Sequence, residues 1–243
     1  MLFGLVPLRH ARHAMCIHRG YHDSRHPPYH TNFPKSHRHF IGDADTTLNL
    51  FHLNQSKVQM HYEQDLIQRL SNPATREQAF GTLVQKFQEP LYWQIRHMVL
   101  DHYDTDDILQ NVFIKAWQGL DNFRGDSRLS TWLYRIASNE CLNFLQRQKQ
   151  TRLSLSLTDD STSDGVRLQL ESDPYFDGDE TEIQLQQAIQ SLPPKQRQVF
   201  NMKYFQELRY EEMSEILGTS VGALKASYHH AKNKITAFFK QLD

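Results

Sequence analysis

The stretch from Phe123 to Arg152 brings together aromatic, cationic and amide side chains, the types that bind nucleic acids. An aromatic ring can stack on an exposed base while guanidinium and amide groups hydrogen-bond to base edges, which is the chemistry of single-stranded DNA binding. A tryptophan in such a helix can equally belong to a core, so both interpretations stay open. Helical spacing places five side chains on one face: Trp132, Arg135, Asn139, Asn143 and Gln146.

A second candidate site lies near the C-terminus, where residues 210–217 and 221–239 have the pattern of two helices. Gly218 would supply the left-handed backbone that a tight turn between them needs. Thr219 or Ser220 would cap the second helix. Helix, short glycine turn and helix form the helix-turn-helix arrangement, which directs its second helix into a DNA major groove. The residues expected to be buried in the pair are Met213, Leu217, Val221, Leu224 and Tyr228.

The charge of this second helix agrees with DNA contact. No acidic residue occurs from Ile216 to Leu242, whereas four lysines do. A one-sided basic helix is typical of proteins that bind phosphates. The alternative is an ordinary helical hairpin with a lysine-rich surface. The basic and imidazole side chains concerned are Lys225, Lys232, Lys234, Lys240, His229 and His230.

Apolar residues at three- and four-residue steps predict the helices that position these side chains. One run extends from Phe80 to Val99, and Pro90 is expected to kink it or divide it into two helices. A following helix is expected after Tyr103, with Thr105 as its N-cap. The face opposite its apolar stripe is either a solvated surface or an interface. That face carries Asp106, Asp107, Gln110, Asn111 and Ile114.

A further helix is expected from Ser130 or Thr131 to about Gln148, with Cys141 and Phe144 on its buried side. The other cysteine, Cys16, belongs to no CxxC pair, so neither a disulfide framework nor a cysteine zinc site is expected. No metal site, cofactor or catalytic group is predicted, because no glycine-rich phosphate loop, HExxH pattern or nucleophile elbow occurs.

Two segments differ in composition from these helices. Between Leu157 and Glu182 lie nine acidic residues and one basic residue, Arg167, which favours a flexible acidic linker. Residues 1–59 hold nine of the fourteen histidines without apolar periodicity. We interpret them as a disordered tail, with Met60 as a possible true start and a metal-binding tract as the weaker alternative.

These patterns together predict an all-α chain with two small helical domains. The expected ranges are a tail over 1–59, a first domain over 60–152, a linker over 153–181 and a second domain over 182–243. No apolar stretch approaches the ~18 residues of a membrane span, and the N-terminus is a poor signal peptide, so we expect a cytoplasmic protein without membrane insertion.

Four motifs carry a resemblance to a known family. They are DDILQNVFIKAW (residues 106–117), FRGDSRLSTWLYRIASN (123–139), LPPKQRQVF (192–200) and SVGALKASYHHAK (220–232). In this order they resemble the sigma-70 family of bacterial sigma factors. More narrowly, they are similar to its extracytoplasmic-function (ECF) group, which keeps only regions 2 and 4. The resemblance covers roughly residues 62–240.

The resemblance implies a function and partners. A sigma factor binds core RNA polymerase and directs initiation at promoter DNA, and an anti-sigma factor is a further expected partner. The acidic linker would thread polymerase channels. The implied polymerase-binding residues are Asp106, Asp107, Gln110, Asn111 and Ile114. Those implied for opening and reading the −10 element are Phe123, Arg124, Arg128, Trp132, Arg135, Asn139 and Asn143. Those implied for the −35 element are Ser220, Gly222, Lys225, Ser227, His229 and Lys232.

One departure from the family pattern limits what can be carried over. The family commonly has arginine in the recognition helix where this chain has Ser227 and His230. Two-pronged arginine contacts to guanine are therefore not expected there. The alternative functions are a helix-turn-helix regulator that binds duplex DNA without polymerase and, less favoured, a histidine-based metal enzyme.

Overall fold

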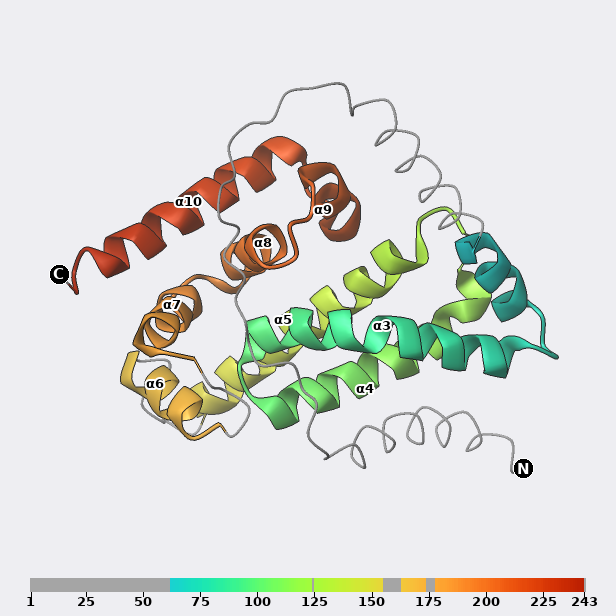
Figure 1. Ribbon diagram of the computed structural model, residues 1–243, viewed down its shortest axis with the longest axis horizontal. Coiled ribbons are helices and arrows are strands. Elements are labelled where there is room, and N and C mark those ends of the chain that lie inside the picture. The colour runs from blue at the N-terminus through green and yellow to red at the C-terminus, as the bar shows by residue number, and fades with distance from the viewer. Residues whose placement is uncertain (1–61, 124, 155–162, 174–177, 243) are drawn as a thin grey trace, which may run out of the picture.

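The structure is a computed structural model that describes residues 62–123, 125–154, 163–173 and 178–242. Every regular element in these ranges is helical, which confirms the predicted all-α class. Figure 1 shows the chain as two groups of helices, with α8 and α9 of the second group lying against the first. The predicted histidine tail and Arg124 lie outside the described residues.

The first group is a helical bundle. It contains a helix over 62–71, α3 (Arg76–Val99), α4 (His102–Gly119), the short 3-10 helix η1 (Leu120–Asn122) and α5 (Leu129–Ser154). Its core is one cluster of fully buried side chains that includes Leu83, Leu91, Ile95, Phe113 and Leu133. The predicted apolar faces of these helices meet in this core.

Pro90 does not divide α3, so that alternative in the sequence prediction is wrong. The helix continues through the proline as a single element of 24 residues. Phe87 before it and Leu91 after it are both buried in the same core. Packing on both sides therefore holds the helix together although the proline removes one backbone hydrogen bond.

The beginning of α4 also differs from the prediction. Asp101, not Thr105, is the N-cap, and its Oδ1 accepts a hydrogen bond from the Asp104 amide at 2.8 Å. Thr105 lies one turn inside the helix, fully buried, and its hydroxyl donates to the Asp101 carbonyl at 2.6 Å. The helix starts earlier because Leu100, at φ 63, ends α3 and leaves Asp101 in the extended conformation that suits a cap.

Helix α5 is longer than predicted, beginning at Leu129 and ending at Ser154. The amide of Leu129 donates a hydrogen bond to the Glu63 carboxylate, so the helix over 62–71 helps to satisfy the start of α5. Cys141 is buried as predicted, and burial raises the pKa of its thiol to about 12. The thiol is therefore neutral and unreactive near pH 7.

The segment predicted as a flexible linker contains a helix in its described part. Helix α6 (Ser163–Glu171) buries Val166 and Leu170 against Leu100 and Ile183. Asp173, just after α6, forms an ion pair with Arg96 of α3, and both side chains are more than nine-tenths buried. Two apolar residues four positions apart give this acidic stretch one buried face, which a count of charges does not reveal.

The second group contains α7 (Glu180–Gln190), α8 (Pro194–Tyr204), α9 (Tyr210–Leu217) and α10 (Val221–Phe239). Gly218 has φ 62, the predicted left-handed turn, and the Ser220 hydroxyl caps α10 by accepting from the Ala223 amide. Met213 and Ile216 are the buried residues of α9, whereas Leu217, predicted to be buried, is only half-buried. The helix-turn-helix arrangement is present.

The two groups are joined by contacts between α3 and α8. Asn201 is 2% exposed, and its amide nitrogen donates to the His97 carbonyl at 2.8 Å. The ring of His97 stacks on Phe205 with centroids 4.0 Å apart. Arg197, also buried, donates to the Met98 carbonyl at 2.9 Å. Desolvation lowers the pKa of this guanidinium to about 10, which still leaves it charged near neutral pH.

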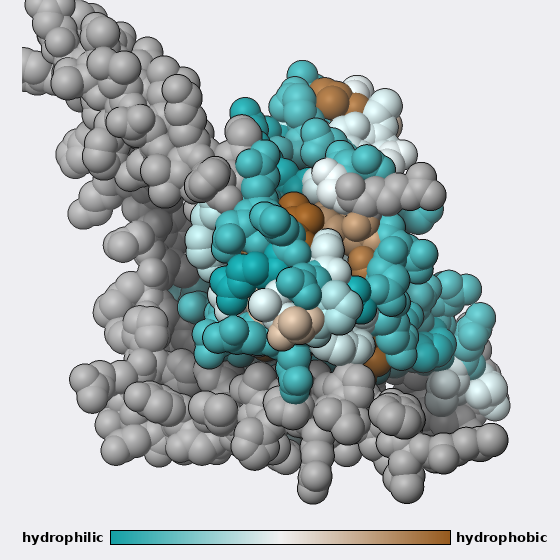
Figure 2. Space-filling view, turned by 90° about the vertical axis from the view of Figure 1, so that its right-hand side faces the viewer, coloured by the Kyte–Doolittle hydropathy of each residue, from teal (hydrophilic) through white to brown (hydrophobic). Residues whose placement is uncertain are grey.

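The described surface is mainly polar. Figure 2 shows one face on which a few hydrophobic residues lie among hydrophilic ones. None of the described helices is both long enough and apolar enough to cross a membrane.

Candidate nucleic-acid interface

Trp132 on α5 packs against the core of the first group and is also partly exposed at the surface. Its ring packs beside Phe123, with centroids 4.8 Å apart. A Cβ added to Gly119 would lie 3.1 Å from the ring, which shows how closely the indole covers the end of α4. The ring is only half-buried. This packing holds the indole in one orientation while leaving part of it accessible for stacking.

The polar residues predicted beside Trp132 lie at the surface of α5 or, for Arg128, directly before its first residue. Arg128, Asn139 and Asn143 are exposed, so their side chains are available to a ligand. Arg135 also lies at the surface, but its guanidinium contacts α9: Nη2 donates to the Glu215 carbonyl at 2.5 Å and Nε to the Ile216 carbonyl at 3.3 Å. The predicted face is therefore assembled, with one of its cations already engaged within the chain.

Helix α10 presents a stripe of four predicted −35 residues. Gly222, Lys225, His229 and Lys232 follow one another at steps of three, four and three, which places them on one side of a helix. All four are exposed, whereas Leu224, Ala231 and Ile235 are buried on the opposite side. The stripe is therefore open to solvent along its length.

Local contacts position individual members of this stripe. The ammonium of Lys225 lies 5.7 Å from the centre of the Tyr210 ring, a cation–π contact from α9 to α10. His229 Nε2 lies 3.0 Å from the amide nitrogen of Asn233. Ser220 is occupied as the N-cap, and Ser227 is half-buried. Gly222 has nothing within 4 Å of the position where a Cβ would stand.

The predicted polymerase face on α4 is also assembled. Asp107 and Asn111 are exposed, and Asp106, Gln110 and Ile114 are half-buried beside them. Asp106 lies 3.6 Å from His102 Nε2. Negative charge is concentrated at this end of α4: burial, and then the carboxylates of Asp101 and Asp107, raise the pKa of Asp104.

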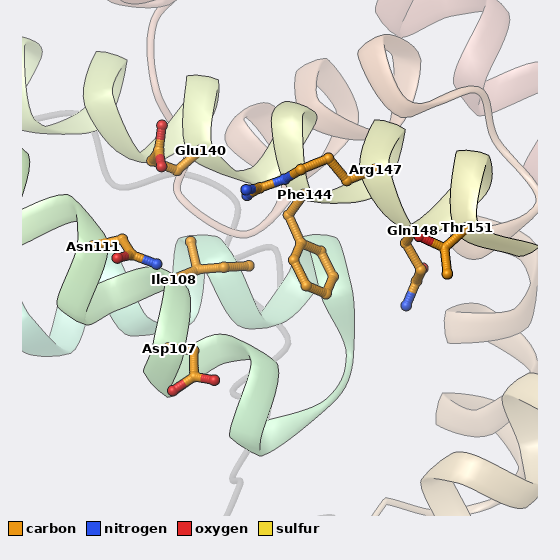
Figure 3. Close-up of a pocket in the computed structure, with 8 residues that line it drawn as sticks. All are labelled: Asp107, Ile108, Asn111, Glu140, Phe144, Arg147, Gln148 and Thr151. Atoms are coloured by element: carbon orange, nitrogen blue, oxygen red, sulfur yellow. The ribbon is translucent and has the colours of Figure 1, made fainter.

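An open cavity of about 570 Å³ borders this face between α4 and α5. Figure 3 shows Asp107, Ile108 and Asn111 on the α4 side and Phe144 and Arg147 on the α5 side, with the Phe144 ring pointing towards α4. Sequence reasoning assigned Phe144 to the buried side of α5 and gave Arg147 no place at this surface. The spacing of apolar residues predicts which side of α5 is buried. Only the packing of α4 against α5 brings the α4 residues of this cavity close to Phe144 and Arg147.

Tyr134 is a further residue that sequence reasoning missed. It is half-buried and packs against both the core of the first group and the cluster of α8, α9 and α10. Its backbone carbonyl accepts a hydrogen bond from Gln94 at 3.3 Å. Its position in the pattern of α5 could have suggested a second buried face, but not the element that covers it.

Comparison with known families matches both groups of helices. Residues 83–151 match the family described as "Sigma-70 region 2", and residues 182–235 match "Sigma-70, region 4". The chain is 32% identical over 178 residues to the RNA polymerase sigma-H factor of Pseudomonas aeruginosa, covering 71% of this chain and 91% of that protein. The chain belongs to the ECF group of the sigma-70 family. The predicted sigma factor is thus confirmed as a transcription initiation factor and not an enzyme.

Other relatives agree with this assignment. The chain is 29% identical to the ECF RNA polymerase sigma factor SigW of Bacillus subtilis, over 68% of this chain and 91% of SigW. It is 31% identical to the ECF RNA polymerase sigma-E factor of Escherichia coli, over 65% of this chain and 85% of that protein.

Solved structures share the fold. The structure of CnrH in complex with the cytosolic domain of CnrY matches with a TM-score of 0.53 and 23% identity, over 74% of this chain and 97% of the matched chain. The co-crystal structure of RpoE with the anti-sigma factor NepR from Bartonella quintana matches with a TM-score of 0.54 and 21% identity, over 66% of this chain and 96% of the matched chain.

Proposed function

We propose that this sigma factor docks on core RNA polymerase through α4, opens and reads the −10 element with α5, and binds the −35 element with α10. The observation that carries the proposal is that the residues matched to the family also form the exposed polar surfaces of the structure. The two matched sigma regions contain the exposed polar faces of α4 and α5 and the basic stripe of α10, in the family's order along the chain.

For the polymerase dock, the supporting feature is the acidic and amide face of α4. Asp107 and Asn111 are its most exposed members, and the neighbouring cavity lies between α4 and α5. A helix of the polymerase clamp would place basic side chains against this charge, because complementary charge guides association and fixes its register. The half-buried Ile114 would add an apolar contact.

For the −10 element, Trp132 would stack on an unpaired base, and Asn139 and Asn143 would hydrogen-bond to base edges. Phe123 would hold the indole, as its packing indicates. Arg128, Arg135 and Arg124 would contact the strand's phosphates. Stacking of one base on an aromatic ring is worth roughly 1–3 kcal/mol.

For the −35 element, Lys225 and Lys232 would bind phosphates, and Gly222 would let the helix backbone come close to the DNA. Ser220, Ser227 and His229 would supply hydrogen bonds. Since no arginine occurs in this helix, specificity would rest on these short polar groups and on DNA shape.

The wider proposals follow from family membership. The chain would act in the cytoplasm, and an anti-sigma factor would regulate it, since one of the matched structures contains a sigma factor bound by an anti-sigma factor. The domains would span 60–152 and 182–243, with 153–181 between them. In the open polymerase complex α6 would leave its present site if this segment threads polymerase channels.

Run-off transcription with purified core polymerase and genomic promoter fragments tests the proposal. The wild-type chain should give discrete promoter-specific transcripts. Replacing Asp107 and Asn111 by alanine should weaken core binding, whereas Gln118→Ala, an exposed change in the same helix, should not. If no specific transcript forms while a control sigma factor is active, the proposal is wrong. Duplex binding without polymerase dependence would instead indicate an ordinary helix-turn-helix regulator.

A further inference from the structure

The contact of Arg135 with α9 uses groups that every helix leaves unsatisfied. The last carbonyls of an α-helix have no intrahelical partner and carry the negative end of its dipole. In α9, which ends at Leu217, the Ser214 carbonyl accepts from the Gly218 amide. The next two carbonyls, of Glu215 and Ile216, both accept from the Arg135 guanidinium. One α5 cation therefore binds the C-terminal end of α9.

Acidic side chains of α9 lie beside the same part of α5. A crevice of about 160 Å³ separates the two helices, with Arg128 and Tyr134 on one side and Glu211, Glu212 and Glu215 on the other. The pKa of Glu212 is lowered, first by its hydrogen bond to Arg209 and, among smaller causes, by the charge of Arg128. The α9 side of this crevice carries three glutamates and one arginine, Arg209, which pairs with Glu212, so its net charge is negative.

A second set of contacts, away from this crevice, holds the two groups of helices together. Asn201 and Arg197 of α8 donate to backbone carbonyls of α3, and Phe205 stacks on His97. None of these residues belongs to the proposed polymerase or DNA faces. The closed arrangement therefore depends on contacts that can be changed without altering those faces.

We propose that α9 acts as an intramolecular substitute for the DNA strand, occupying the part of the −10 face that contains Arg128 and Arg135 until the two groups of helices separate. The proposal rests on the proposed function of the α5 face. The carbonyls of Glu215 and Ile216 stand where phosphate oxygens would meet Arg135, and the glutamates add negative charge beside Arg128. Arg135 cannot serve α9 and a DNA strand at the same time.

Closure of this kind has a definite effect on affinity. When only the open fraction of a protein binds, the apparent dissociation constant equals the intrinsic constant divided by that fraction. Any change that weakens the contact of α8 with α3 should therefore strengthen binding of single-stranded DNA to α5. A purely structural contact would not change that affinity.

Asn201→Ala in the full chain is the main test. It removes the bond to the His97 carbonyl at a site that is 2% exposed, so the closed state should weaken by roughly five- to thirtyfold. Phe205→Ala removes the stack on His97 and is the second variant. Lys195→Ala, an exposed change in the same helix, is the matched control. Circular dichroism establishes that each variant keeps its helices.

Two measurements are made on each variant. Donor and acceptor dyes on cysteines introduced at exposed Gln118 and Lys240 report the separation of the two groups by energy transfer, in a Cys16→Ser background. Cys141 remains unlabelled because it is buried. Fluorescence anisotropy reports the affinity for a random-sequence single-stranded DNA pool.

We expect the same energy transfer in Lys195→Ala as in the wild type, and a changed transfer in both opening variants. Single-stranded DNA should bind the opening variants roughly five- to thirtyfold more tightly. Unchanged transfer in both opening variants, or changed transfer without a gain in affinity, would overturn the inference even if run-off transcription succeeds. If run-off transcription fails while transfer changes as expected in both opening variants, the proposed function would be wrong and the closed arrangement would stand.

Discussion

Replacing Gly222 by alanine separates the DNA-binding role of α10 from its stability. Gly222 is the second residue of α10 and lies on the exposed stripe. It is not among the residues with positive φ, and an added Cβ would meet no atom within 4 Å. The substitution therefore adds a methyl group that is harmless to the free protein but projects towards the proposed DNA.

The expected magnitude follows from helix propensity. Alanine is better than glycine in a helix interior by up to about 1 kcal/mol, and less near an end. A gain of this size raises the melting temperature by about 2–4 °C in a chain of this length. Affinity for a −35 duplex should fall roughly tenfold, about 1.4 kcal/mol, because the backbone can no longer come as close to the DNA.

Gly218→Ala is the matched comparison. The backbone of Gly218 has φ 62, a left-handed conformation that costs an alanine ~1–2 kcal/mol of folding free energy. This cost does not come from a clash, because no atom lies within 4 Å of the position of the added Cβ. Urea unfolding and electrophoretic mobility shift with a −35 duplex measure both variants. We expect opposite changes in the free energy of unfolding. If Gly222→Ala binds the duplex as tightly as the wild type, the α10 backbone does not come close to the DNA at this position. If Gly218→Ala is as stable as the wild type, the turn does not require a left-handed glycine.

Three further predictions concern other parts of the chain. Lys225→Ala should reduce the slope of log affinity against log salt for the −35 duplex by about 1, measured by salt titration; an unchanged slope would remove this lysine from the phosphate contacts. Trp132→Ala should impair promoter opening, detected by permanganate footprinting, more than closed-complex binding, and the reverse order would contradict a stacking role. Burial, and then the charge of Arg96, lower the pKa of His97 to about 4 in the folded chain. The unfolded chain, with a pKa near 6.5, therefore takes up the proton first, so stability should fall as the pH drops from about 6.5 to 4 and change little above. His97→Gln should flatten this dependence in urea titrations; an equally steep curve would show that another group is responsible.

The interfaces were accessible from the sequence to different degrees. The α10 stripe could be predicted because it depends on local features: Gly218, the Ser220 cap, and lysines at helical spacing without nearby acids. The acidic face of α4 could be located but not interpreted, since a polar helix face is most often only solvated. The beginning of α4 was misplaced because the positive φ of Leu100, which frees Asp101 to cap, has no local signature.

The sequence by itself determined the helices, the turn between α9 and α10, and the charge of the exposed faces, because these follow from the period of apolar residues and from capping and turn chemistry. Only the tertiary structure decided which faces meet. It buries Val166 and Leu170 of an acidic segment, places Phe144 and Asp107 around one cavity, and sets Arg135 against the end of α9. Such contacts join residues far apart in the chain, and their free energy depends on how whole helices pack, which no local pattern specifies.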